Sequence, residues 1–458
     1  MEDKRISNRA NGCLVIWNIG LFALVWFLYY NRYTFDTYLL QGGILSVVIF
    51  CVIYYAISSV YSAHRIASVQ IGETVFSQVV SFGIADLVLY IECCLIHNRM
   101  VNLMPGVIAV FLQIIGTMCI VTIAKRYLMK HIPPQKTVFV YGKDISKEEI
   151  LSFKERILKK YEHLFDVQNM VSETIDKEQL HQYIHECETV LFYEVSRENR
   201  AGLIEEAMRD EKSIYLTPRL SDVILMGCEP RHLLDTPLLR YGYAYQKKSL
   251  HGSKRMFDLI FSIVLLVVAS PIMLITAIAI KIEDNGPVFY KQARCTKDGK
   301  VFDILKFRSM IVDAEKNGSI PCTEGDPRIT KVGKIIRATR LDELPQIINI
   351  LKGEMSFVGP RPERVEHVEQ FTKELPEFAY RMRVKGGLTG YAQIYGKYNT
   401  SAYDKLRLDL MYIENQSFLL DLKLLMLTFK IMFTPESTEG FTEEKSQELA
   451  VESQANEN

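Results

Sequence analysis

The first part of the chain is dominated by apolar positions. Residues 10–124 hold only seven Asp, Glu, Lys or Arg side chains, whereas these four types make up 24% of the whole chain. Four apolar runs lie near 12–30, 38–57, 75–96 and 106–124, and each approaches the roughly 20 residues that a helix needs to cross a hydrocarbon core. We therefore expect residues 1–130 to form a bundle of four transmembrane helices.

Basic residues flanking these runs predict how they are oriented, because cytoplasmic loops are rich in Lys and Arg. Eight basic residues precede the first run, separate the second from the third, or follow the fourth. The two other loops hold only Arg32 and Arg99. We expect a multi-pass protein whose N-terminus and remaining domains face the cytoplasm. Asp86 and Glu92 lie inside the third run; an intramembrane acid can be functional, although a role in helix packing is the favoured interpretation.

Residues 131–246 alternate short apolar segments with charged helical ones. Strands are predicted near 137–141, 165–171, 189–193 and 213–216, with a helix over 147–160. This alternation is typical of a parallel α/β sheet. Its first turn holds the single glycine Gly142 where a dinucleotide-binding fingerprint needs three. A Rossmann-like domain that serves packing or regulation is therefore favoured over one that binds a nucleotide.

A fifth apolar run, 259–280, has two features that argue against a crossing. Ser270 and Pro271 fall near its middle, where a proline removes a helix hydrogen bond and bends the chain. Basic clusters flank both of its ends, and a crossing would place one cluster outside. We expect a re-entrant helix over about 256–281 that enters one leaflet and returns, with a kinked span as the alternative. From Lys247 to Arg308 there are eleven Lys or Arg and five Asp or Glu, which suits anionic lipid or a lipid phosphate.

The following segments combine acidic residues with Arg, Gly and Pro. Asp342 and Glu343 are adjacent carboxylates that could share one Mg²⁺ with substrate phosphates, and an aspartate can also act as a nucleophile. Alternatively, such a pair is a solvated helix end. The sequence Gly359-Pro-Arg-Pro362 predicts a rigid turn presenting Arg361, an arginine suited to phosphate. The glycines of 385–390 either bring backbone close to a ligand or form a flexible loop.

Together these segments resemble the bacterial sugar transferase family, the monotopic phosphoglycosyl transferases. The resemblance runs from about Lys254 to Pro435. The segments that carry it are Lys254-Arg-Met-Phe-Asp258, Ala269-Ser-Pro271, Gly286-Pro-Val-Phe-Tyr290, Lys306-Phe-Arg-Ser-Met310, Leu341-Asp-Glu-Leu-Pro-Gln346, Phe357-Val-Gly-Pro-Arg-Pro362 and Gly387-Leu-Thr-Gly390. Four spans followed by a Rossmann-like domain are similar to the long-form members, which initiate capsule, exopolysaccharide or O-antigen assembly.

The resemblance implies a reaction and a site. A UDP-hexose would donate hexose-1-phosphate to polyprenyl (undecaprenyl) phosphate and release UMP, on the cytoplasmic face of the bacterial inner membrane. Asp342 would be the nucleophile that forms a phosphosugar intermediate, and Glu343, with Asp342, would hold Mg²⁺. Arg361, Lys306, Arg308 and Arg340 would bind substrate phosphate. Ser270 and Pro271 would form the break of the re-entrant helix, and long-form relatives suggest a homodimer.

These expectations give a membrane protein of α and α/β class in four parts. They are four transmembrane helices (1–130), a Rossmann-like domain (131–246), a mainly α catalytic domain (247–435) and an acidic, disordered tail (436–458). Lys plus Arg equal Asp plus Glu at 54 each, so bulk-charge binding of nucleic acid is not expected. A membrane-anchored scaffold and an aspartyl phosphatase remain alternatives, although the Asp-x-Asp typical of the latter is not evident.

Overall fold

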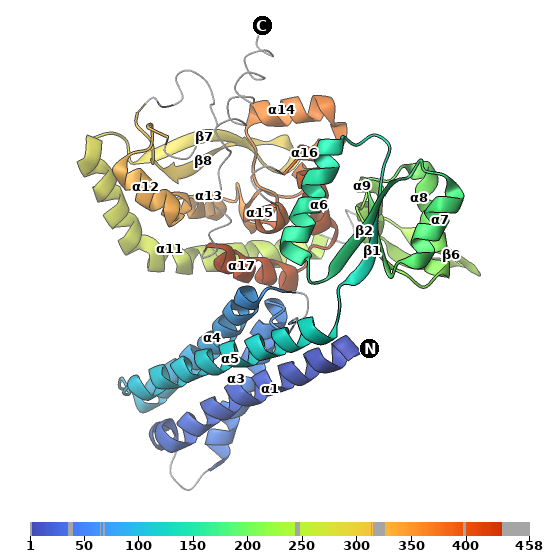
Figure 1. The fold of residues 1–458 in the computed structure, drawn as a ribbon. Helices are drawn as coiled ribbons and strands as arrows, with labels where there is room; N and C mark the ends of the chain where they lie inside the picture. The colour runs from blue at the N-terminus through green and yellow to red at the C-terminus, as the bar shows by residue number, and fades with distance from the viewer. Residues whose placement is uncertain are drawn as a thin grey trace. The chain divides into compact units, whose positions relative to one another are not determined.

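The computed structural model describes residues 2–34, 40–64, 66, 69–242, 248–312, 314, 326–396 and 400–432, and forms two compact units, Met1–Thr217 and Pro218–Asn458 (Figure 1). Each unit is described by itself. The tail predicted over 436–458 lies outside the described residues.

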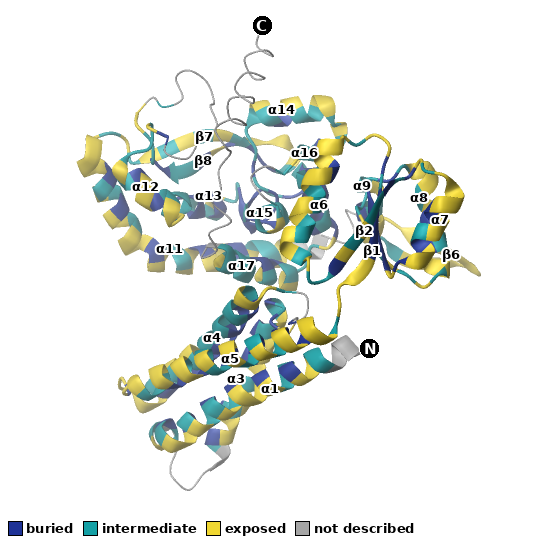
Figure 2. Cartoon of the chain, viewed as in Figure 1, coloured by how far each residue is buried: buried dark blue, intermediate teal, exposed yellow. Residues whose placement is uncertain are grey.

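The first unit begins with four long apolar stretches of helix that coincide with the four predicted spans. By length and composition, the segments Ile6–Tyr33, Gly42–Val60, Ile71–His97 and Met104–His131 could each cross a membrane. Large apolar side chains such as Leu28, Val52 and Phe111 are exposed on them. Figure 2 shows bands of exposed residues, in yellow, along these helices. Such surfaces suit lipid rather than water. The elements are α1 (Glu2–Val25), a π-helical turn (Trp26–Tyr30), α2 (Asn31–Thr34), α3 (Leu40–Val60), α4 (Ile71–His97) and α5 (Met104–His131).

The helices pack through an aromatic cluster and a polar network. Phe22 of α1 stacks on Phe50 of α3 with ring centroids 4.0 Å apart. The Tyr54 hydroxyl donates to Oε1 of Gln78 at 2.6 Å, and Asn18 and Gln113 extend this buried network to α1 and α5. Polar side chains can hydrogen-bond across membrane helices, so this network fixes which faces meet.

The rest of the first unit is a four-stranded parallel sheet in the order β2-β1-β3-β4, which confirms the predicted parallel α/β arrangement. Alternate side chains of β1 point to opposite faces: Phe139 packs with Ile150 of α6, whereas Val138 and Val140 pack with residues of α7 and α8 such as Leu180. The elements are β1 (Gln135–Tyr141), α6 (Lys147–Tyr161), β2 (Phe165–Ser172), α7 (Lys177–Glu186), β3 (Thr189–Tyr193), α8 (Arg197–Arg209) and β4 (Ser213–Leu216).

The second unit is mainly helical, with three pairs of short strands. It begins with α9 (Leu220–Met226) and a hairpin of β5 (Glu229–Leu233) and β6 (Thr236–Arg240). Its core surrounds α16, whose Leu406 and Leu410 are fully buried beside Phe357 and Val223. The remaining elements are α11 (Lys248–Asp284), β7 (Phe289–Cys295), β8 (Val301–Phe307), α12 (Lys331–Ala338), α13 (Gln346–Lys352), β9 (Ser356–Val358), α14 (Val365–Glu374), β10 (Gly387–Thr389), α15 (Tyr391–Tyr395), α16 (Ala402–Glu414) and α17 (Phe418–Met432).

Helix α11 corresponds to the predicted re-entrant helix, but it is not interrupted. It runs for 37 residues with Pro271 inside it, and the Ser270 hydroxyl donates to the Val267 carbonyl at 2.8 Å. Figure 1 shows the ribbon of α11 turning part-way along its length. A proline bends a helix without necessarily ending it, so the chain passes Pro271 as a bent helix and not as two helices.

Both ends of α11 are fastened within the second unit. Near its start, Arg255 donates to the carbonyls of Ile350 and Leu351, both at 2.7 Å. Near its end, Glu283 accepts the backbone N–H of Lys331 at 2.7 Å, and Asp284 pairs with Arg308. The middle carries exposed apolar side chains: Val264, Val267, Val268, Leu274 and Ile275. The helix therefore begins and ends on the same unit, and between its anchors it exposes one apolar face while Ala269 and Thr276 are buried.

Candidate active site

The Asp-Glu pair lies in a tight turn between α12 and α13. Arg340 adopts a left-handed backbone conformation (φ 58°), which ends α12 and starts a 3₁₀ turn over Leu341–Glu343. Leu341 and Leu344 pack against the cluster of Ile280, Phe307 and Ile336. Pro345 occupies the N-cap position of α13. Because Leu341 and Leu344 point toward the core, the side chains of Asp342 and Glu343 lie on the opposite side of the turn.

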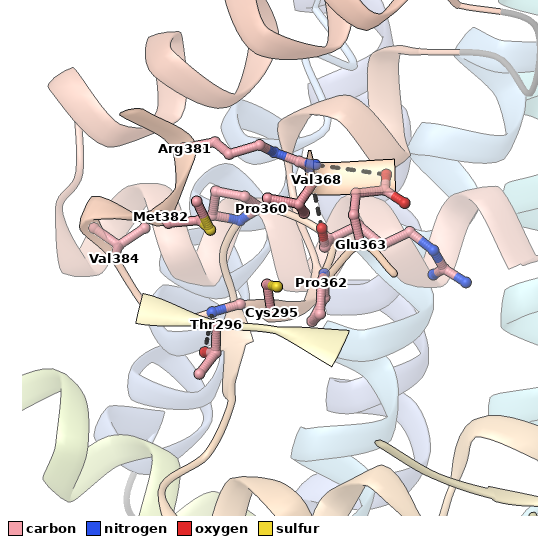
Figure 3. Close-up of a pocket in the computed structure, with 11 residues that line it drawn as sticks. Cys295, Thr296, Pro360, Pro362, Glu363, Val368, Arg381, Met382 and Val384 are labelled. Carbon is pink, nitrogen blue, oxygen red and sulfur yellow. Dashed lines mark hydrogen bonds and ion pairs between the residues drawn. The ribbon is translucent and has the colours of Figure 1, made fainter. Parts of the chain in front are cut away.

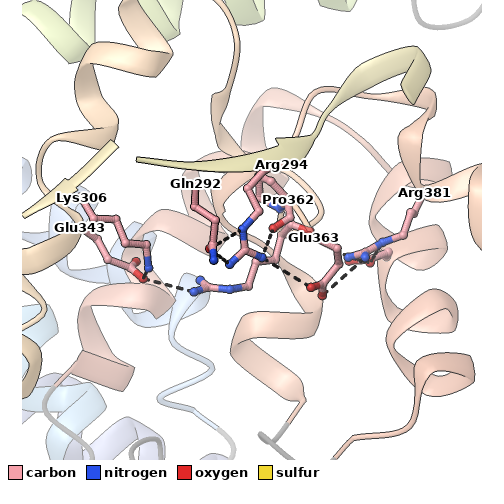
Figure 4. Close-up of polar contacts among 9 residues, drawn as sticks. Gln292, Arg294, Lys306, Glu343, Pro362, Glu363 and Arg381 are labelled. Carbon is pink, nitrogen blue, oxygen red and sulfur yellow. Dashed lines mark hydrogen bonds and ion pairs between the residues drawn. The ribbon is translucent and has the colours of Figure 1, made fainter. Parts of the chain in front are cut away.

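Glu343 is held by two cations from distant parts of the sequence. Lys306 Nζ, at the end of β8, lies 3.0 Å from Glu343 Oε1, and Arg361 Nη2 lies 3.2 Å from the same oxygen (Figure 4). Burial alone would raise the pKa of Glu343, but the charges of Lys306 and Arg361 lower it well below its ordinary value. Glu343 is therefore an anion at any working pH.

Asp342 has a different environment from its neighbour. Among the residues that the structure describes, no side chain donates a hydrogen bond to it, and it is half-buried. Burial raises the pKa of Asp342 above the ordinary value for an aspartate, while the charge of Lys306 acts in the opposite sense. An available carboxylate of raised pKa is a better nucleophile than one neutralised by an ion pair.

The predicted Gly-Pro-Arg-Pro turn is held rigidly by its backbone. Gly359 N–H donates to the Thr389 carbonyl, and Gly387 N–H donates to the Pro360 carbonyl, both at 2.8 Å. The two segments approach so closely that a Cβ on Gly359 or Gly387 would collide with the backbone of the other. The glycines of 385–390 thus bring two parts of the protein's own backbone together.

Two arginines that the sequence analysis did not single out support this turn from behind. Arg294 donates to the Pro362 carbonyl at 3.1 Å, and Arg381 donates to the Arg361 carbonyl at 3.0 Å (Figure 4). Arg381 is 4% exposed and is itself paired with Asp409, 1% exposed, at 2.8 Å. Charged residues are rarely this buried unless paired, and pairs so distant in sequence leave no local signal.

A small pocket lies behind the same turn (Figure 3). It is lined by Pro360–Glu363, Cys295 and Arg381 among others, but not by Asp342, Glu343 or Lys306. The pocket is therefore part of the support of Arg361 and does not include the carboxylate pair.

The remaining predicted site residues divide between two places. Arg340 lies close enough to Asp342 and Glu343 for its charge to lower the pKa of both carboxyls. Arg308 instead pairs with Asp284 at the end of α11, and its guanidinium lies where a Cβ on Gly286 would be. In the structure one site thus contains Lys306, Arg340, Asp342, Glu343 and Arg361. Arg308 instead helps to attach the end of α11 to the rest of the unit.

The carboxylates of Asp342 and Glu343 could bind Mg²⁺ only if a substrate supplied further ligands. Within the described residues no group of three or more His, Cys, Asp or Glu side chains could hold a metal ion. Mg²⁺ usually takes one or two carboxylates and completes its shell with water and substrate phosphates. Asp342 and Glu343 supply such a pair, and a phosphate would have the cations Lys306 and Arg361 beside it.

Comparison with known proteins agrees with the resemblance seen in the sequence. Residues 249–435 match the family described as bacterial sugar transferase. The chain is 42% identical over 184 residues to a UDP-N-acetylgalactosamine-undecaprenyl-phosphate N-acetylgalactosaminephosphotransferase of Aeromonas hydrophila, covering 40% of this chain and 44% of the relative. It is 45% identical over 180 residues to a UDP-glucose:undecaprenyl-phosphate glucose-1-phosphate transferase of Klebsiella pneumoniae, covering 38% and 39%.

A shorter relative is matched over most of its length. The chain is 41% identical over 183 residues to an uncharacterized sugar transferase of Bacillus subtilis (strain 168), which covers 40% of this chain and 88% of that protein. The chain spans less than half of the two longer relatives it matches. The region that matches the family thus lies within the second unit, from the start of α11 to just beyond α17.

Proposed function

Because the chain belongs to the bacterial sugar transferase family, we propose that it transfers a hexose-1-phosphate from a UDP-sugar to polyprenyl (undecaprenyl) phosphate and releases UMP. The relatives from Aeromonas hydrophila and Klebsiella pneumoniae carry names that describe such transfers. The observation that carries the proposal is the contrast within the Asp-Glu pair. Glu343 is neutralised by Lys306 and Arg361, whereas Asp342 keeps an available carboxylate next to them.

The chemistry would run in two steps. An oxygen of Asp342 forms a bond to the phosphorus that carries the sugar, and the bond from this phosphorus to the bridging oxygen breaks. UMP leaves with that oxygen and its electron pair. An oxygen of polyprenyl phosphate then attacks the same phosphorus and the Asp342 carboxylate departs, giving a polyprenyl diphosphate sugar. Fixed cations such as Arg361 and Lys306 stabilise the negative charge that develops on phosphate oxygens.

Asp342 and Glu343 would hold Mg²⁺ together with the donor diphosphate. The bound ion would supply further neutralisation of diphosphate charge. The ion pairs of Glu343 keep it ionised and therefore able to bind a cation. Arg340 adds positive charge to the same turn, whereas a phosphate-binding role for Arg308 would require it to leave Asp284.

The proposal includes a topology and a division of the chain. Four helices within residues 1–130 cross the inner membrane as a bundle, and α11 enters one leaflet and returns, so that the site faces the cytoplasm. Helix α11 has 37 residues. At about 1.5 Å per residue, a straight helix of 37 residues would be longer than the roughly 30 Å thickness of the hydrocarbon core. Yet both ends of α11 are fastened to one unit, which favours re-entry. The Rossmann-like domain, the acidic tail and a homodimer complete the predicted architecture.

Purified full-length protein with Mg²⁺, polyprenyl phosphate and a panel of UDP-sugars tests the activity by UMP release. With donor alone, mass spectrometry should find the protein heavier by one hexose phosphate, and Asp342→Asn should abolish both this adduct and turnover. Absence of UMP with every donor would favour a scaffold, and release of inorganic phosphate would favour a phosphatase. If UMP appears only once the lipid is present and no adduct forms, the lipid phosphate attacks directly and the two-step scheme is wrong.

A further inference from the structure

The carboxylate of Glu173 occupies a special position in the parallel sheet. In the order β2-β1-β3-β4, the connections of β1 and β3 leave in opposite directions. Ligands of open α/β sheets bind in the crevice at the carboxyl ends of such strands. Glu173 directly follows β2, and its backbone N–H donates to the Tyr141 carbonyl at the end of β1 at 2.9 Å. Its side chain extends from there across the end of β1 to the loop that follows β3.

Both oxygens of this carboxylate are fully engaged. Glu173 Oε1 accepts the backbone N–H of Lys143, after β1, at 3.0 Å. Oε2 accepts the backbone N–H and the hydroxyl of Ser196 at 3.0 and 2.6 Å, and Asn199 Nδ2 at 3.1 Å. The residue is only 6% exposed. Its four donors therefore come from the loops after β1 and β3 and from the first turn of α8.

These donors are the kind that a phosphate would use. Backbone N–H groups at the start of a helix, together with the helix dipole, favour an anion. Ser196 precedes α8, yet its hydroxyl donates to Glu173 and does not cap the helix. Gly142 allows the loop after β1 to approach closely, because a Cβ there would collide with the Glu194 carbonyl. The pKa of Glu173 is lowered despite its burial, since the donors from Ser196 and Lys143 stabilise the charged form.

We propose that the α/β domain has an anion-binding site at the switch point of its sheet and that the Glu173 carboxylate is its built-in ligand. The domain then binds no nucleotide phosphate at this crevice, and the carboxylate instead ties together the ends of three strands. This inference is independent of the transferase activity, because it concerns residues of the first unit alone.

Hydrogen–deuterium exchange of the full-length protein in detergent tests the proposal through the amides of Lys143 and Ser196. Addition of NAD⁺ or ATP should leave their exchange unchanged in the native protein. In Glu173→Ala, exchange should accelerate about tenfold or more, because both N–H groups lose a buried acceptor. Acetate or inorganic phosphate should restore protection in this variant, whereas chloride at equal ionic strength should not. If only acetate restores protection, the site is specific for a carboxylate. If acetate and phosphate both restore it, the site binds anions in general.

Two further variants keep the test decisive. Glu173→Gln fills the same space but presents an amide NH₂ to one set of donors, so exchange should accelerate without rescue by acetate. It also serves if the alanine variant does not fold. Glu155→Ala, on the exposed face of α6, should behave as the native protein. Nucleotide-dependent protection of the native amides, unchanged exchange in both Glu173 variants, or failure of both anions to rescue Glu173→Ala would overturn the proposal.

Discussion

At the scale of single residues, the adjacent acids Asp342 and Glu343 differ because their partners differ. The ion pairs of Glu343 keep its pKa low, whereas burial raises that of Asp342. A nucleophilic Asp342 must be ionised, so adduct formation should decline with falling pH earlier than the titration of an ordinary aspartate would predict. The charge of Arg337 acts against this increase and lowers the pKa of Asp342. Arg337→Gln should therefore move the acid limb of the rate–pH profile to higher pH.

The matched control for this profile is Lys334→Gln, an exposed cation on the same helix. It should leave the acid limb where it is in the native protein. An Arg337→Gln profile that coincides with the native one would show that a group other than Asp342 controls the rate.

The support of Arg361 gives a second prediction at this scale. Arg381→Lys keeps the charge but loses the fork that donates to both Asp409 and the Arg361 carbonyl. Because misplacing a catalytic group by about 1 Å can cost up to about a hundredfold in rate, kcat should fall about tenfold to a hundredfold. The loss should not add to that of Arg361→Lys, because both changes act through one guanidinium.

The comparison is Arg383→Lys, because Arg383 lies with Arg381 in the 3₁₀ helix Pro376–Arg383 but donates to the Tyr241 hydroxyl. It should retain nearly native kcat. Fully additive losses in the Arg361→Lys, Arg381→Lys double variant would mean that Arg381 supports the fold in general and does not position Arg361.

At the scale of elements, apolar periodicity and turn residues predicted much of what the structure shows. The strands over 189–193 and 213–216 have the predicted limits. Such patterns could not predict which residues far apart in the sequence contact one another. Arg381 with Asp409, Arg308 with Asp284, and Glu173 with Ser196 pair residues far apart in the sequence, and Arg381, Arg308 and Glu173 are buried although their residue types usually face water. The candidate site was therefore predicted as a set of motifs, without the arginines that support it.

Helix α11 supplies the prediction at the element scale. If it re-enters, a cysteine at Asn285, just beyond its last turn, should react with a membrane-impermeant reagent only from the cytoplasmic side. A cysteine at Met100, in the exposed loop between α4 and α5, should react from the opposite side and serves as the control. Both cysteines belong in a background without other reactive thiols. Labelling of both positions from the same side would contradict the proposed topology.

At the scale of the whole molecule, the second compact unit begins at Pro218 and so includes residues that precede the predicted catalytic domain. The catalytic domain was expected to begin at 247, but Val223 of α9 is fully buried among Leu410, Ile413 and Phe357 of the second unit. A chain that begins at Pro218 should therefore keep transfer activity in detergent. One that begins at Lys247 loses Val223, and burial of such a side chain contributes about 1.5–3 kcal/mol.

Unfolding temperature and UMP release of the two truncated proteins check this prediction. The longer one should unfold at the higher temperature and be the more active. Equal stability would show that α9 is dispensable. A well-folded but inactive longer protein would show that the first unit takes part in the chemistry.

Helix α11 is attached at both ends to one folded unit, so the distance by which its middle can extend from that unit is fixed. The anchors at Arg255 and Glu283 determine how far the bend of α11 can extend from the carboxylate pair. A crossing helix must match bilayer thickness by tilting or by deforming the lipid, but a helix that returns to its own domain meets no such demand from the far leaflet. Reconstituted into vesicles of shorter or longer acyl chains, the truncated protein that begins at Pro218 should therefore turn over at nearly the same rate. The depth at which the lipid phosphate meets Asp342 would then be a property of the protein and not of the membrane around it.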